Sequence, residues 1–200
     1  MFRLVNGFFL IFIFVACHLF VFPMFLAASD KVTLNQIPSS LTASRSIVES
    51  IVEGFQQVCD DMYKGLDSSF DKTKKNTVEL YPQDFYDIQI NSAGKMATVI
   101  FAGFYCPGFG GHPFGGSGGS PTFIIVDGKT FKTDLARGVF SVTESDLTFI
   151  NIFLHGMNCK NSDNGESMPG YKGCVNVTIW DDELKTFYGH NNILKLVGTN

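Results

Sequence analysis

From about residue 76 onward, this chain is a series of short apolar segments separated by turn-forming residues. Tyr86, Ile88 and Ile90 alternate with polar residues, which is typical of a strand with one buried face. The segment 96–105 is apolar at odd and even positions alike and is predicted to be a central strand. Asp127-Gly128 indicates a two-residue hairpin, because both residue types tolerate positive φ. Further strands are predicted at 123–126, 130–135, 139–143, 147–155, 175–179, 184–188 and 193–197.

One amphipathic helix is predicted before these strands. Apolar residues recur at steps of three and four from Ile47 to Phe70 and form one stripe. The segment 46–49 (Ser-Ile-Val-Glu) fits a capping box, in which the serine and glutamate side chains accept hydrogen bonds from free backbone N–H groups. We therefore predict a helix over about 44–70, with Gly65 as an alternative, earlier end. The expected fold class is α+β, with this helix packed on an antiparallel β-sheet or sandwich of about eight short strands.

The first thirty residues have the pattern of a secretory signal peptide. Arg3 precedes an apolar run over 8–26, and small residues occupy 27–29. We expect cleavage near residue 29, which leaves one domain over 30–200 in a secreted or extracellular location. The alternative is an uncleaved anchor that holds the domain at the membrane, outside the cytoplasm, because about 19 apolar residues can also span a bilayer.

The cysteine content fits an exported chain. Cys17 lies in the leader, and an even number of cysteines then remains, which is expected to form disulfides. Sequence alone allows three pairings. We favour Cys159–Cys174, which closes a polar, glycine-rich loop, and Cys59–Cys106 then joins the helix to a strand. Four buried thiols are the alternative for a chain that is not exported, and the absence of a C-x2-C pair argues against structural zinc.

Charge and composition limit the partners that this chain can have. The formal charge is −4 at pH 7, and loss of the single positive charge of Arg3 with the leader makes it −5. No basic surface for nucleic acid is therefore expected. No cofactor is expected, and the domain is predicted to be a monomer. Asn176-Val177-Thr178 is a glycosylation sequon, and Asn176 is expected on the solvent-facing side of its strand, opposite the alternating apolar residues.

The stretch 103–121 is rich in glycine, with aromatic residues interleaved. Two G-x-G-x-x-G registers fail within it, because Pro113 and Pro121 occupy the third glycine position and no helix follows. A flexible hairpin loop is one interpretation. The other is a mobile binding loop, in which aromatic rings supply contact area at a low entropic cost. The predicted ligand-binding residues are Phe104, Tyr105, Phe109, His112 and Phe114.

The surroundings of each catalytic or metal-binding motif argue against it. A G-x-S-x-G match centres on Ser117, but a strand-like segment follows where a nucleophile elbow needs a helix. His112, His155 and His190 have no spacing that requires a shared metal ion. The loop 161–166 is calcium-like in composition but lacks acidic residues at the first and last ligand positions.

The sequence therefore favours a secreted or surface-exposed, disulfide-stabilised binding module that uses its aromatic glycine-rich loop. The ligand is predicted to be a protein, a glycan or a small apolar molecule. A second hypothesis is a small secreted hydrolase that uses Ser117 or a His/Asp pair. A third, which requires the leader to be retained, is a membrane-anchored structural component of an envelope or surface assembly.

Overall fold

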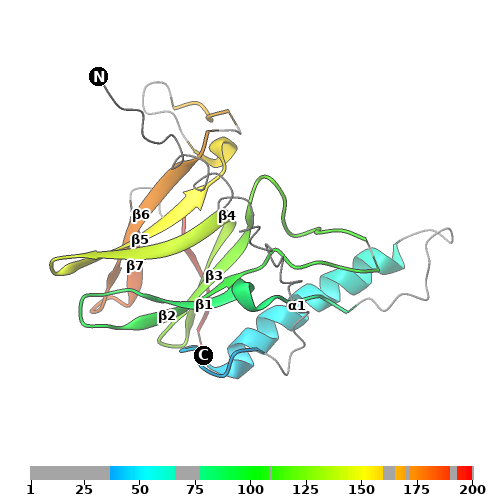
Figure 1. The fold of residues 1–200 in the computed structure, drawn as a ribbon, viewed down its shortest axis with the longest axis horizontal. Helices are drawn as coiled ribbons and strands as arrows, with labels where there is room; N and C mark the ends of the chain where they lie inside the picture. Colours follow the sequence, from blue (N-terminus) through cyan, green and yellow to red (C-terminus); the bar gives the residue numbers. More distant parts are fainter. Residues whose placement is uncertain are drawn as a thin grey trace, which may run out of the picture.

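The computed structural model describes residues 37–65, 77–108, 110–159, 165–169, 172–189 and 193–199. These residues form one α-helix and an antiparallel sheet of eight strands (Figure 1), which confirms the predicted combination of a helix and an antiparallel sheet. The helix is α1 (Arg45–Lys64). The strands are β1 (Phe85–Gln89), β2 (Met96–Phe101), β3 (Ser120–Val126), β4 (Lys129–Glu144), β5 (Leu147–Leu154), β6 (Cys174–Asp181), β7 (Thr186–Gly189) and β8 (Lys195–Thr199). The predicted signal peptide lies outside the described residues.

The strands follow one another as a meander. Each of β1 to β6 pairs with the next strand in chain order, and β8 returns to pair with the start of β4. The β3–β4 hairpin turns at Asp127 and Gly128, with φ angles of 50° and 71°, and Val126 pairs with Lys129. The predicted two-residue hairpin is therefore confirmed.

Strand β4 belongs to two layers. Its first half pairs with β3 and β8, and its second half pairs with β5. The sequence pattern predicted two strands, 130–135 and 139–143, and this division is wrong. A shift in register between Ala136 and Gly138 lets one sixteen-residue strand bend without a turn. The first layer is thus β1, β2, β3, the start of β4 and β8, and the second is the rest of β4 with β5, β6 and β7.

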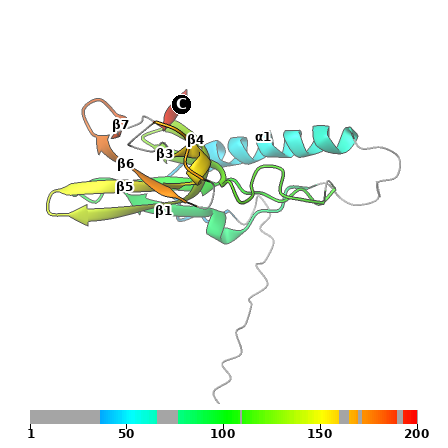
Figure 2. The same ribbon diagram turned by 90° about the horizontal axis from the view of Figure 1, so that it is seen from above.

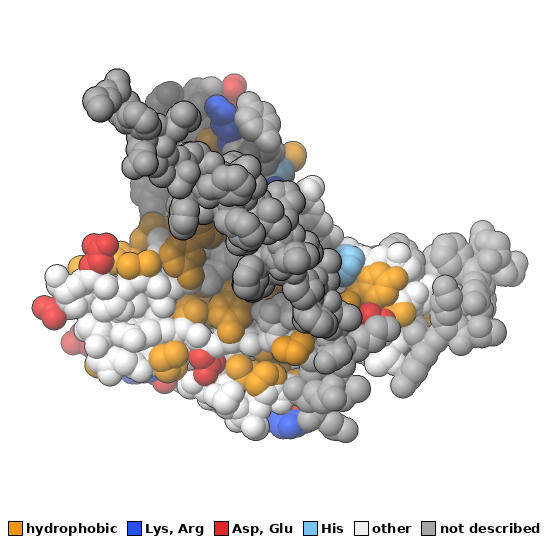
Figure 3. Space-filling model, viewed as in Figure 1, with side chains coloured by type: hydrophobic (Ala, Val, Ile, Leu, Met, Phe, Trp, Pro, Cys, Tyr) orange, Lys and Arg blue, Asp and Glu red, His pale blue; other side chains and the backbone are white. Residues whose placement is uncertain are grey.

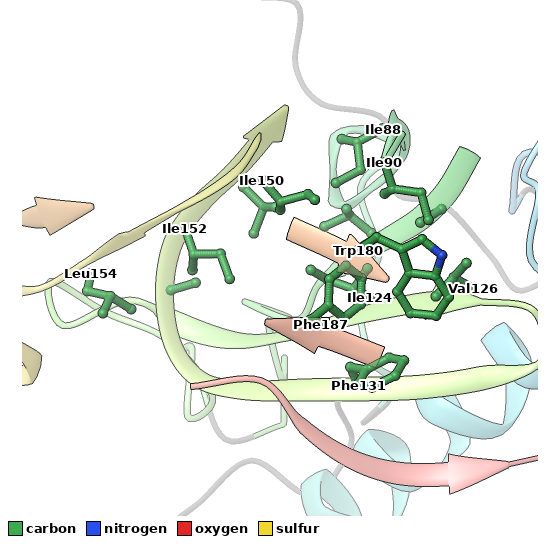
Figure 4. Close-up of a cluster of buried hydrophobic side chains, with 14 of the residues drawn as sticks. Ile88, Ile90, Ile124, Val126, Phe131, Ile150, Ile152, Leu154, Trp180 and Phe187 are labelled. Atoms are coloured by element: carbon green, nitrogen blue, oxygen red, sulfur yellow. The ribbon is translucent and has the colours of Figure 1, made fainter. Parts of the chain in front are cut away.

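An apolar core fills the space between the two layers. Trp180 and Phe187 of the second layer have ring centroids 4.9 Å apart, and Phe131 of the first layer lies 4.9 Å from Phe187. Figure 4 shows these rings beside aliphatic side chains from both layers. The aliphatic members of this core include Ile88, Ile90, Ile124, Val126, Ile150, Ile152 and Leu154. Its residues come from strands on both sides of the bend in β4, so the core holds the two layers together.

The first half of helix α1 lies against the other face of the first layer, and the helix then continues past the ends of the strands, as Figure 2 shows. Its Phe55 ring has edge contacts with Phe104 at 5.1 Å and with Phe123 at 6.0 Å between centroids. The buried helix residues share one cluster with strand residues such as Ile100 and Ile125. Strands β2 and β3 are therefore buried on both faces, which is why segment 96–101 is apolar at odd and even positions.

The ends of α1 differ in part from the prediction. Gly65 caps the C-terminus, so the helix has the earlier of the two predicted ends, and residues 66–70 lie outside the described chain. The predicted capping box is wrong, because Ser44 is the N-cap and residues 46–49 already lie inside the helix. Glu49 instead pairs with Arg45 one turn before it, at 2.7 Å.

Both favoured disulfides are present. Cys59 of α1 is bonded to Cys106 in the glycine-rich loop, and Cys159 is bonded to Cys174 at the start of β6. The first bridge fastens the loop to the helix. The second one joins the short 3-10 helix that follows β5 (Gly156–Asn158) to the start of β6, and thereby limits how β6 can lie against its neighbour.

Candidate binding surface

The glycine-rich loop uses part of its aromatic content for its own attachment. Phe104 is fully buried, and Phe114 is half-buried with its ring 4.6 Å from that of Phe55. Tyr105 is half-buried and His112 is exposed, and their rings lie 4.9 Å apart. Phe109, the fifth predicted ligand-binding residue, lies outside the described residues. The structure therefore brings these aromatic residues to one region but turns Phe104 into the core beneath α1.

Two acidic residues are buried near the exposed part of this loop. Burial raises the pKa of Asp84 to about 6. The hydrogen bond that its carboxylate accepts from the Tyr81 backbone N–H, and the charge of the nearby His112, lower this pKa and offset part of the rise. Glu79 is also buried, and its carboxylate accepts a hydrogen bond from the Tyr81 hydroxyl at 3.3 Å. Sequence reasoning did not single out either residue, because neither belongs to a recognisable motif.

In the described structure, Ser117 and His155 each contact a different neighbour. Ser117 lies in an exposed turn that leads into β3, and its carbonyl oxygen accepts a hydrogen bond from Arg137 Nε at 2.9 Å. His155 accepts from the backbone N–H of Met157 and so caps a short 3-10 helix. His190 and the loop 161–164 lie outside the described residues. Within the described part of the chain, no cluster of three or more His, Cys, Asp or Glu residues could hold a metal ion.

Strand β6 has the opposite polarity to the one that its sequence predicts. Asn176 and Thr178 point into the core, whereas Val175, Val177 and Ile179 point outward. The expectation that Asn176 faces solvent is therefore wrong: its side chain is 5% exposed, and its Oδ1 has no hydrogen-bond partner among the described residues. Glycosylation of this sequon remains a prediction, and a glycan could be attached only where β6 is not packed in this way.

Two residues at the ends of β6 account for this polarity. Cys174 and Trp180 lie on the same side of the strand as Asn176, because side chains two residues apart share a face. Trp180 packs among the rings of the interlayer core, and Cys174 is held by its disulfide. A shift of one residue would bury the valines but would expel Trp180 from the core.

The outer side of the second layer is consequently an apolar face. Its members lie on strands β4, β5, β6 and β7, and each is between 37% and 54% exposed. They are Phe140, Val142, Leu147, Phe153, Val175, Val177, Ile179 and Tyr188. The pairing register places them in adjacent rows, with Ile179 opposite Tyr188 and Phe153 opposite Val175. The Phe140 and Phe153 rings are stacked, with centroids 5.3 Å apart.

The apolar face contains no charged side chain and has one polar residue near its centre. Asn151 is half-buried between Phe140 and Val177, with which it is paired across the strands. Its Nδ2 donates to the Phe149 carbonyl at 3.4 Å. In Figure 3, acidic side chains lie at the tip of the β4–β5 hairpin, beyond the apolar part of the strands. The charges therefore lie at the rim of this face.

No protein family, curated protein or solved structure matches this chain. Within the described residues, no helix is long and apolar enough to cross a membrane.

Proposed function

We propose that this chain is an exported, disulfide-stabilised binding module that recognises a protein partner through the apolar face. The two disulfides are compatible with an oxidising, extracellular environment. The observation that carries the proposal is the outward direction of Val175, Val177 and Ile179. Their strand buries Asn176 in exchange, with an Oδ1 that has no partner among the described residues, and such local departures from normal patterning are concentrated at functional sites.

The size of the apolar face supports this function. Taking ~150–250 Å² as the surface of a large apolar side chain, its eight members expose roughly 600 Å² together. Contiguous apolar patches on monomers rarely exceed a few hundred Å², and larger ones mark interaction sites. A protein surface suits this face better than a lipid surface, because surfaces that bind anionic lipid combine apolar residues with many Lys and Arg residues. The chain as a whole is acidic.

A photo-crosslinking residue at position 177 tests the proposal. The matched control is the same residue at position 197, because Val197 is 54% exposed on β8, in the other layer. Cross-linking the chain in the medium of a secreting host should give adducts of discrete mass from position 177 and none from position 197. Equal or absent adducts at the two positions would show that the apolar face has no specific partner.

The exposed part of the glycine-rich loop is a second candidate site. Tyr105 and His112 present adjacent rings close to the buried carboxyl groups of Glu79 and Asp84. Rings with a few polar acceptors form sites that suit a glycan or another partly apolar ligand. A glycan array probed with the secreted protein should lose its signal in Tyr105→Ala and keep it in Leu196→Ala, since Leu196 is 52% exposed on β8. Equal signals from the two variants would contradict a role for this loop.

A further inference from the structure

We infer that the apolar face is covered by a second copy of this chain, packed face to face across a two-fold axis that lies between the two sheets. The inference rests on the proposed function, because it names the partner that this face binds. It differs from the monomer that the sequence predicted.

The exposed area is sufficient for a symmetric dimer. A face of roughly 600 Å² on each copy removes about 1,200 Å² in total, which exceeds the ~1,000 Å² expected for a specific interface. The face consists of four adjacent strands with large side chains in rows. Two such sheets can pack as the layers of a sandwich do, with side chains interdigitated. A homodimer interface is also typically more apolar than the rest of the surface.

The charges at the rim select one orientation of the two copies. Strands β4 and β6 run in the same direction, so Arg137 and Lys172 lie at one end of the face. Glu144, Asp146 and Asp181 lie at the other end. A two-fold axis perpendicular to the strands places the basic end of each copy over the acidic end of the other. An axis parallel to the strands would instead bring like charges together, which disfavours that arrangement.

The same acidic end also carries Lys95 and Lys185, and Lys95 is paired with Asp127 and Asp182 of its own chain. Lys185 precedes β7, but its ammonium group lies 3.5 Å from Asp127 and 3.6 Å from Asp182. Those two carboxylates belong to the same chain and balance the two lysines there. The lysines therefore do not cancel the acidic character of this end.

The cross-strand pairs at the two ends of the apolar face are consistent with this orientation. Phe153 pairs with Gly138 at the basic end, and Leu147 pairs with Glu144 at the acidic end. Rotation about the perpendicular axis superposes these two outer rows. Phe153 of one copy then packs on Leu147 of the other, and Arg137 lies next to Glu144 of the other copy. Within one chain these two charges are seven residues apart along β4, too far for contact.

The first experiment is sedimentation of the oxidised, secreted chain. We expect the mass of two chains at roughly micromolar concentration. Val177→Lys should weaken association by at least about 100-fold, because it buries an unpaired charge. Val142→Lys provides a second variant of the same face, and Val197→Lys is the matched control that should leave the dimer intact. Unchanged near-ultraviolet circular dichroism and protected thiols show that each variant is folded.

A charge exchange tests the orientation. Arg137→Glu and Glu144→Arg should each weaken the dimer about 10-fold, and the double variant should restore it, since opposite charges again meet across the axis. Failure of the double variant to restore the dimer would overturn the proposed orientation.

The results separate this inference from the proposed function. A wild-type chain that stays monomeric overturns the second copy as the occupant. A cross-link at position 177 to a species of another mass then preserves the binding function with a different partner. A monomer that gives no cross-link contradicts both the dimer and the proposed binding function.

Discussion

Lys95 Nζ lies 3.1 Å from Asp182 Oδ1 and joins the β1–β2 turn of the first layer to the β6–β7 turn of the second. The same ammonium group lies 2.5 Å from Asp127 Oδ2 in the β3–β4 turn. It also lies 5.6 Å from the centre of the Trp180 ring, within reach of a cation–π interaction. Three turns that are distant in sequence thus meet around one cation at this end of the two layers.

Loss of this cation should destabilise the domain. We expect Lys95→Met to lower the free energy of unfolding by about 1 kcal/mol, because the pair is partly exposed and screened by solvent. Lys64→Met is the control, since the ion pair of Lys64 with Asp61 within α1 is well exposed. Urea unfolding at neutral pH measures both. Equal effects of the two substitutions would contradict a special role for Lys95.

Acid should weaken the same cluster. Hydrogen bonds from Asn91, Lys95 and Trp180, with the charge of Lys95, lower the pKa of Asp182 to about 2. A carboxyl group with a pKa below its unfolded value of about 3.9 contributes stability above that value, which is lost as the pH falls toward 2. Unfolding measured from pH 5 to pH 2 should show a smaller loss in Asp182→Asn than in the wild type.

Asp84 should have the opposite pH dependence. Because burial raises its folded pKa to about 6, the folded state binds a proton more tightly than the unfolded state does. The stability contributed by this group is therefore full below about pH 4 and is lost as the pH rises through about 6. Asp84→Asn should be more stable than the wild type by about 1 kcal/mol at pH 8, with no such gain at pH 4. A constant difference across this range in urea unfolding would contradict the assignment.

The two disulfides should differ in their contribution to stability. The Cys59–Cys106 bridge spans 47 residues and the Cys159–Cys174 bridge spans 15. Since longer closed loops restrict the unfolded chain more, we expect paired alanine substitutions to cost about 4 and about 3 kcal/mol, respectively. Urea unfolding of the two double variants measures which loss of stability is larger. A larger loss without Cys159–Cys174 would show that native-state contacts of β6 outweigh the effect of loop length.

Removal of the buried amide should stabilise the fold. Asn176→Val replaces an inward side chain whose Oδ1 has no partner among the described residues, and we expect a gain of about 1 kcal/mol in the free energy of unfolding. Asn151→Val is the control, because Asn151 is half-buried on the outer side of the same layer. A loss of stability in Asn176→Val would indicate that the amide is hydrogen-bonded in solution.

Features that depend on local residue order can be predicted from the amino-acid sequence. The Asp127-Gly128 turn follows from residues that accept positive φ, and the central position of β2 follows from apolar residues on both of its faces. The apolar stripe of α1 can also be predicted from the sequence. The N-cap cannot, because several serines precede the apolar run. The disulfide pairing was favoured on loop composition, but three pairings stayed open until the structure brought the cysteines together.

Which side of each strand is buried depends on tertiary packing. Alternation shows that Val175, Val177 and Ile179 share a face, but it does not show whether that face points inward. Trp180 and Cys174 decide this through contacts with residues far away in the sequence. Long-range packing likewise placed Phe104 in the core, buried Asp84 and left the apolar face uncovered. The candidate binding surface therefore arises from long-range contacts between strands, which local periodicity does not encode.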